Sequence, residues 1–301
     1  MNTEPTSPFA TAVPAAGAAR RPRRHGFLAQ LLRHKGGRFG LACVALFLLL
    51  ALFGRFVVPF DPNASEFTSL LAGPSARHWF GTDELGRDTL SRVVAGSGIA
   101  LAVAMLSVAI AMVLGVLIGV VAGYFGGLVD TVLNRSQDVL FAFPTLLLAI
   151  IIVAVLGPGL FNAVLAIAIV YTPRFARIAR ASALGIKTSE YLDAARLAGV
   201  STPVILVRHV LPNVLPPVIV LAALSMSTAQ LAYASLSFLG LGIPPPAASW
   251  GTMLNDGRKF MESAPHTVIF PGVAISLTVL GFNLLGDGLR DVLDPRLKTL
   301  Q

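Results

Sequence analysis

The sequence predicts an all-α protein that crosses a membrane several times, and three observations lead to this fold class. Hydrophobic residues make up 55% of the 301 residues and charged residues only 13%, against roughly 25% charged in a soluble domain. The mean hydropathy is +0.76. Five long stretches contain no Asp, Glu, Lys or Arg, namely 39–54, 93–129, 139–173, 209–255 and 263–286. These values exclude a disordered chain, a coiled coil and a disulfide-stapled secreted domain.

Six spans fit these stretches, because a helix needs about 20 apolar residues to cross about 30 Å of hydrocarbon. The first span covers 39–60 and carries Arg55 near one end, where a long side chain can reach the interface. Gly157-Pro158-Gly159 separates the third span from the fourth, because proline lacks an amide donor and glycine favours turns. The remaining spans are expected at about 99–121, 139–156, 160–176, 218–239 and 267–285.

The basic residues predict the orientation. Six spans place both termini on one side, which then holds seventeen Lys and Arg residues against six on the other. The positive-inside rule puts that side in the cytoplasm, and the net charge of +8 then needs no nucleic-acid partner. The expected segments are a partly disordered cytoplasmic tail 1–38, an external segment 61–96, a membrane core 97–289 with a cytoplasmic loop 177–212, and a cytoplasmic tail 290–301.

The chain lacks the motifs of a protein that hydrolyses ATP or catalyses a reaction by itself. It has no GxxxxGK[ST] phosphate loop, HExxH or GxSxG, and Cys43 has no second cysteine to pair with. The spans carry no carboxylate of the kind that ion-coupled carriers and intramembrane hydrolases use. We therefore expect a transport subunit rather than an enzyme, with no catalytic residue, metal or cofactor of its own, driven by a partner.

The longest internal cytoplasmic loop predicts a short helix, a tight turn and a second helix. Ser189 can cap the first helix, Gly199 suits a turn that needs positive φ, and Pro203 fits the first turn of the second helix. Composition alone leaves two interpretations open, an amphipathic connector lying on the membrane or a segment that contacts another protein.

The loop resembles the coupling motif of ABC importer permeases, through Asp193, Ala194, Ala195, Gly199, Leu211 and Pro212. The peptide-transporter branch is similar also at Glu190, Tyr191, Arg196, Arg208, His209 and Asn213. Asp193 departs from the Glu of the wider superfamily, and His209 from its Ile. The resemblance covers about 26–298 and includes 80–88 (FGTDELGRD), 141–144 (FAFP), 235–242 (SLSFLGLG) and 283–291 (NLLGDGLRD). The chain is similar to the C-type permease subunit of dipeptide, oligopeptide and nickel importers.

The resemblance implies a type I importer permease fold, a place in a bacterial-type inner (cytoplasmic) membrane, and a set of partners. These are a second, B-type permease, two ATPase subunits that bind ATP and Mg, and an external solute-binding protein that delivers a peptide. The element that couples to the ATPase would comprise Glu190, Asp193, Ala194, Ala195, Arg196 and Gly199. Import of nickel or another small solute, and an ion-coupled secondary carrier, remain as alternatives.

Other features carry two interpretations each. Gly115, Gly119 and Gly123 fit close helix packing better than a place on the translocation path. The segment Thr82-Asp83-Glu84-Leu85 suits either a capped external helix or a docking point for the binding protein. Trp79 and Trp250 are expected to anchor the external interface.

Overall fold

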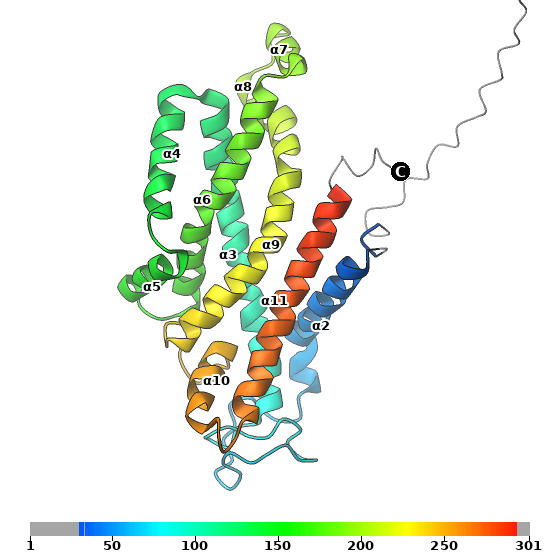
Figure 1. Cartoon of the computed structure of the whole chain (residues 1–301), viewed down its shortest axis with the longest axis vertical. Helices are drawn as coiled ribbons and strands as arrows, with labels where there is room; N and C mark the ends of the chain where they lie inside the picture. Colours follow the sequence, from blue (N-terminus) through cyan, green and yellow to red (C-terminus); the bar gives the residue numbers. More distant parts are fainter. Residues whose placement is uncertain (1–29, 33, 294–301) are drawn as a thin grey trace, which may run out of the picture.

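The computed structural model describes residues 30–32 and 34–293. This part of the chain is nearly all helical and contains no strand, only an isolated bridge between Thr82 and Asp88. The predicted all-α membrane fold is confirmed. Five helical runs, side by side in Figure 1, are long and apolar enough to cross a membrane: α2 (Lys35–Val57), α3 (Thr89–Phe125), α6 (Leu160–Lys187), Thr202–Phe238, and α11 (His266–Leu293).

The third predicted span is wrong as a single helix. The chain instead forms α4 (Gly127–Phe141) and α5 (Thr145–Leu156), bent by 90° at the break between them. Pro144 supplies no amide donor, and proline disfavours helical backbone in the residue before it. The 12 residues of α5 reach only about 18 Å, too short to cross the hydrocarbon, so α4 and α5 together make the sixth candidate span.

Two helices are longer than the predicted spans. α3 begins at Thr89, inside the segment predicted as external, because Asp88 caps it and accepts a hydrogen bond from Ser91 N at 2.8 Å. α6 continues beyond 176 as far as Lys187, through most of the first third of the predicted loop 177–212. Both helices are therefore longer than the hydrocarbon is thick. The 37 residues of α3 extend over about 55 Å.

Prolines lie inside the fifth span rather than before it. The run Thr202–Phe238 consists of α8 (Thr202–Ile205), a π-helical turn η1 (Leu206–Val210) and α9 (Leu211–Phe238). Pro216 and Pro217 are interior residues of α9. The wider turn η1 ends two residues before Pro212, which has no amide hydrogen to donate to the backbone.

Among the described residues, the most extensive helix–helix contact is between α3 and α6. A Cβ added at Gly123 would lie 2.8 Å from the Arg180 carbonyl oxygen and 2.9 Å from the Ala183 Cβ, and Gly115 and Gly119 abut α6 in the same way. The packing interpretation of this glycine repeat is confirmed. Only glycine allows the two backbones to approach this closely.

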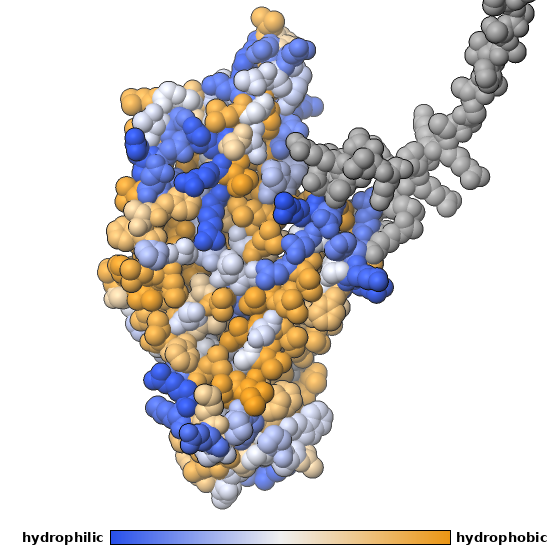
Figure 2. Space-filling model, in the orientation of Figure 1, coloured by the Kyte–Doolittle hydropathy of each residue, from blue (hydrophilic) through white to orange (hydrophobic). Residues whose placement is uncertain are grey.

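The bundle has two polar ends and an apolar middle (Figure 2). At one end, uppermost in Figure 1, α7 (Glu190–Leu197) and α8 extend beyond the other helices; we call it the α7 end. At the other, the α10 end, lie the loop 58–88, α10 (Trp250–Gly257) and the 3-10 turn η2 (Arg258–Phe260). The predicted tails fall largely outside the described residues, although α11 continues to Leu293.

Candidate functional site

The structure brings the predicted coupling residues together at the tip of the α7 end (Figure 1). Five of them lie on α7, and the sixth, Gly199, lies two residues beyond its end: Glu190, Asp193, Ala194, Ala195, Arg196 and Gly199. All are exposed except Ala195, which is half-buried. Ser189 occupies the N-cap position, but its hydroxyl donates to the Ile186 carbonyl oxygen at 2.5 Å and makes no capping bond, so its predicted capping role is wrong.

Gly199 ends α7 in a defined turn. Its φ is +76°, the left-handed region that side chains disfavour. Gly199 N donates to Arg196 O at 3.0 Å and Val200 N donates to Ala195 O at 3.1 Å, the paired bonds of a Schellman motif. No atom lies within 4 Å of a Cβ added at this position. Glycine is thus required by the backbone conformation and not by a neighbour.

Two leucines of α7 lie on opposite sides of the helix, one facing the bundle and one facing away from it. Leu192 is fully buried in the main hydrophobic core, whereas Leu197 is 90% exposed. Sequence analysis missed both, because a short helix with one inward and one outward leucine has no distinctive period. Leu197 is an apolar side chain placed where a second protein could cover it.

The charged residues of α7 pair within the helix. Arg196 Nη1 lies 2.8 Å from Asp193 Oδ1, with side chains 37% and 62% exposed. The Arg196 guanidinium also sits 5.6 Å from the centroid of the Tyr124 ring at the end of α3. Arg196 is thus held by one exposed ion pair and one contact with an aromatic ring. The charges of Asp193 and Arg196 are therefore accessible for contact with another protein.

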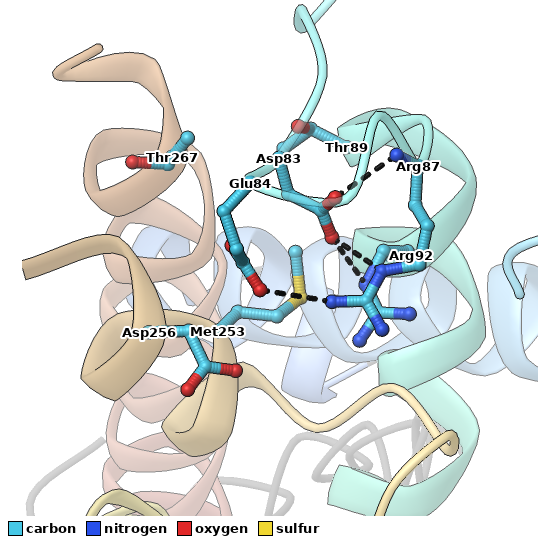
Figure 3. Close-up of a pocket in the computed structure, with 8 residues that line it drawn as sticks. All are labelled: Asp83, Glu84, Arg87, Thr89, Arg92, Met253, Asp256 and Thr267. Carbon is cyan, nitrogen blue, oxygen red and sulfur yellow. Dashed lines mark hydrogen bonds and ion pairs between the residues drawn. The ribbon is translucent and has the colours of Figure 1, made fainter. Parts of the chain in front are cut away.

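The α10 end carries a second polar cluster (Figure 3), in which Asp83, Arg87 and Arg92 are buried and Glu84 and Asp256 are half-buried. Asp83 Oδ2 accepts from Arg87 Nε at 2.7 Å and lies 3.4 Å from Arg92 Nε. Glu84 Oε1 lies 3.2 Å from Arg87 Nη2, and Asp256 from α10 faces the same cavity of about 10 Å³, room for about one water molecule. Burial raises the pKa of the Glu84 carboxyl, Asp83 and Asp256 raise it further, and Arg87 opposes them.

This geometry corrects two predictions. Residues 82–85 do not form a capped helix but a turn, in which Asp83 Oδ1 accepts from the backbone amides of Leu85 and Arg87 at 2.9 Å each. Asp83 points into the protein and is not available as a docking point. Trp250 is buried and donates to Val93 O at 2.8 Å, so it packs α10 on α3 instead of anchoring an interface.

Histidines also tie this end together. His78 Nδ1 lies 2.9 Å from Asp88 Oδ1, and the His266 ring nitrogen Nε2 lies 3.0 Å from Thr82 O. Within residues 30–32 and 34–293, no three His, Cys, Asp or Glu side chains are arranged to hold a metal ion.

Comparison with known proteins agrees with this architecture. Residues 115–299 match the family described as binding-protein-dependent transport system inner membrane component. Residues 24–74 match the N-terminal transmembrane domain of oligopeptide transport permease C.

Full-length relatives are similar over nearly the whole chain. A dipeptide transport system permease protein of Alkalihalophilus pseudofirmus is 43% identical over 99% of this chain and 100% of its own length. A glutathione transport system permease protein of Pectobacterium atrosepticum is 44% identical over 94% of each chain, and one of Escherichia coli is 46% identical over 91% of each.

The fold also has a solved counterpart. A chain of an inward-facing methionine ABC transporter superposes with a TM-score of 0.54 at 20% identity, over 67% of this chain and 96% of its own. The long matched region and the full-length relatives lead to one conclusion. The chain belongs to the binding-protein-dependent transport system inner membrane components, the membrane permeases of ABC importers.

Proposed function

We propose that the chain is the permease subunit of an ATP-driven importer of peptides. With a second permease it forms the translocation path, and an external binding protein delivers di- or oligopeptides to it. Full-length similarity to dipeptide and glutathione permeases supports a peptide-type substrate. Nickel or another small solute is the alternative cargo.

The observation that carries this proposal is the way in which α7 is attached to the bundle and exposed at the α7 end. A fully buried Leu192 fixes α7 to the core, while its remaining surface, including Leu197, is left uncovered. A rigid protruding helix of this kind can transmit a movement of an ATPase to the bundle. Such transmission is needed because ATP held by a partner shifts the permease only through contacts that differ between its two states.

The proposal includes an orientation and a division of labour. The α7 end, with both termini, faces the cytoplasm and two ATPase subunits, which bind ATP and Mg. The α10 end faces the binding protein. Glu190, Asp193, Ala194, Ala195, Arg196 and Gly199 form the contact with an ATPase, and this chain contributes no cofactor site.

Reconstitution tests the proposed function directly. The complete complex in liposomes should take up a radiolabelled dipeptide only when ATP is inside, where the ATPases lie, and the loaded binding protein is outside. Peptide should also stimulate ATP hydrolysis. Uptake by this subunit alone, driven by an ion gradient, would contradict the proposal. Uptake of nickel but not of peptide would make nickel the cargo in place of peptides.

A further inference from the structure

A cleft of about 560 Å³ lies at the α10 end, between α2, α3 and the loop that joins them. Its volume is typical of ligand pockets in proteins. The helix α2 contributes Ala51 and Arg55 to the lining, and α3 contributes Ser91, Val94 and Ala95. On each helix these residues are three or four positions apart, which places them on one face. The cleft is therefore enclosed by one face of each helix and by the loop.

Contacts within the chain fix the loop side of the cleft. Arg92 Nη1 donates to the carbonyl oxygen of Pro62 at 3.0 Å, which ties the loop to α3. The ring of Phe60 stacks on His78, with centroids 4.6 Å apart. Both Phe60 and Pro62 line the cleft. The shape of the cleft is thus built into the fold, as it is in most ligand sites.

Two opposite charges line the cleft and are not paired with each other. Arg55 has no carboxylate within 4.0 Å among the described residues, and its guanidinium lies 4.6 Å from the centroid of the Phe56 ring. Asp61 Oδ1 accepts from Asn63 N at 2.8 Å, and Asp61 Oδ2 accepts no hydrogen bond within the described part of the chain. The cleft thus offers one positive and one negative group to the same ligand.

Most of the other lining residues are apolar, among them Leu50, Val58 and Val94. The helix α2, which lies at the edge of the bundle in Figure 1, also leaves large apolar side chains uncovered, such as Leu52 at 60% and Phe56 at 70% exposed. Exposed apolar surface of this kind marks a site of contact with a membrane or with another protein. A ligand with an apolar part and a charged head group fits these surroundings better than a free ion does.

Arg55 also lies close to the end of a candidate membrane span. Residues 39–54 of α2 carry no charge, Arg55 follows them directly, and the helix ends at Val57. Arginine side chains near the end of a span extend to the head groups of the bilayer. The anion that a cation meets among the head groups is a lipid phosphate.

We infer that this cleft binds one phospholipid whose head group carries a phosphate and a primary ammonium, the chemistry of phosphatidylethanolamine. A guanidinium can donate to two phosphate oxygens at once, so Arg55 binds the phosphate. A primary ammonium has three hydrogens to donate, and Asp61 Oδ2 accepts one of them. The acyl chains lie on the apolar side chains of α2. The inference needs the membrane location of the family and neither the cargo nor the orientation of the chain.

Lipid binding to the purified complex tests the inference. The complex is delipidated in detergent and titrated with phosphatidylethanolamine, phosphatidylglycerol or phosphatidylcholine of the same acyl chains, and bound lipid is measured by native mass spectrometry. We expect phosphatidylethanolamine to bind about tenfold more tightly than the other two, the effect of one hydrogen bond to a charged group. Phosphatidylglycerol brings no cation to Asp61, and the quaternary ammonium of phosphatidylcholine has no hydrogen to donate.

Two variants separate the two contacts. Arg55→Gln should weaken the binding of all three lipids by about tenfold, because the phosphate that they share loses its partner. Asp61→Asn should weaken only phosphatidylethanolamine, to the level of phosphatidylglycerol. If wild-type protein bound phosphatidylglycerol as tightly as phosphatidylethanolamine, the inference would be overturned.

The matched control is Arg258→Gln. Arg258 is an exposed arginine of the same end that also lies over an aromatic ring, Phe238 at 5.5 Å, and it does not line the cleft. Its replacement should leave all three affinities unchanged. Weakening by Arg258→Gln equal to that by Arg55→Gln would show that the lipids respond to charge in general, and would overturn the site.

Further measurements distinguish the lipid from other occupants. Glycerophosphoethanolamine, which is the head group without acyl chains, should not displace the lipid at equal concentration, and displacement would overturn the lipid as the ligand. In a Cys43→Ser background, a thiol-to-amine cross-link from Val58→Cys to the second permease would overturn it as well, because that subunit would then fill the cleft.

A measurement on the wild-type complex keeps the inference testable if a variant fails to assemble. Phosphatidylethanolamine with a photoreactive group on an acyl chain should label α2 of this chain, as located by peptide mass spectrometry. Unlabelled phosphatidylethanolamine should suppress this labelling more strongly than phosphatidylglycerol does. Labelling that is absent from α2 would overturn the inference.

Discussion

The two ends of the molecule treat charge in opposite ways. At the α10 end, Arg87 and Arg92 have side chains only 8% and 4% exposed and are paired with Asp83. At the α7 end, Asp193 is 62% exposed and its partner Arg196 37%. The charged side chains of the first end are buried and paired within the chain, and those of the second are exposed to the surroundings.

This difference has an energetic reason. A buried guanidinium needs a carboxylate in place, because removing one partner of a buried pair costs about 3–5 kcal/mol. An exposed pair such as Asp193–Arg196 adds at most about 1 kcal/mol. Substitutions at the α10 end should therefore act on stability, and those at the α7 end on coupling to the ATPase.

The largest effect is expected from Asp83→Ala. The substitution leaves Arg87 and Arg92 buried without their shared carboxylate and removes the acceptor of two backbone amides. We expect the free energy of unfolding to fall by about 3–5 kcal/mol, measured by thermal or denaturant unfolding of the detergent-purified complex.

The matched control is Asp61→Ala, an exposed aspartate of the same loop that accepts one bond from Asn63 N. It should change stability by less than about 1 kcal/mol. A loss of the same size in both variants would show that the ion cluster does not stabilise this end.

Gly199→Val comes next in size. A β-branched residue at φ +76° costs about 1–2 kcal/mol, and the space around the site is open, so the protein should still insert. Transport and peptide-stimulated ATP hydrolysis should be lost because the turn after α7 is displaced.

Gly185→Val provides the comparison for that variant. Gly185 lies in α6 with no neighbour within 4 Å and without positive φ, so its replacement should leave uptake intact. Normal uptake by Gly199→Val would remove the coupling role assigned to this turn.

A smaller effect on stability is expected for Arg196→Gln. Breaking the exposed pair with Asp193 should cost less than about 1 kcal/mol in the unfolding of the subunit. Peptide-stimulated ATP hydrolysis should fall more clearly, since the proposed contact surface loses a charge. A large loss of stability with unchanged hydrolysis would reverse the assignment of the two ends.

The smallest effect concerns pH. The raised pKa of Glu84 means that the folded protein favours the protonated carboxyl. Its contribution to stability is thus full below the ordinary glutamate pKa of about 4 and is lost as the pH rises through the raised value. Glu84→Gln should flatten the pH dependence of the unfolding midpoint within that window. An unchanged slope would show that Glu84 does not titrate there.

Sequence patterns predicted those features that depend on spacing alone. The glycines of α3 repeat every four residues, and they pack on α6 as that period requires. The turn at Gly199 was predictable because a residue without a side chain readily adopts positive φ. Charge-free stretches predicted six spans, of which five are single helical runs. They did not predict the break at Pro144, because two short apolar helices and one long one have the same composition.

Features that depend on distant contacts escaped prediction. Trp250 is buried because Val93, far away in the sequence, offers it a carbonyl oxygen. Asp83 faces inward because Arg92 and α10 close over it. The Arg180–Asp130 ion pair forms only because α4 lies beside α6, and no local period encodes that placement.

The central claim is that the α7 end is the one that binds the ATPase. Cross-linking of the complete complex tests it directly, with Leu197→Cys at one end and Trp79→Cys, 67% exposed, at the other, both in a Cys43→Ser background. A short thiol-to-amine reagent should join the ATPase subunit to position 197 and not to position 79. Cross-links to the ATPase from position 79, with none from position 197, would contradict the account.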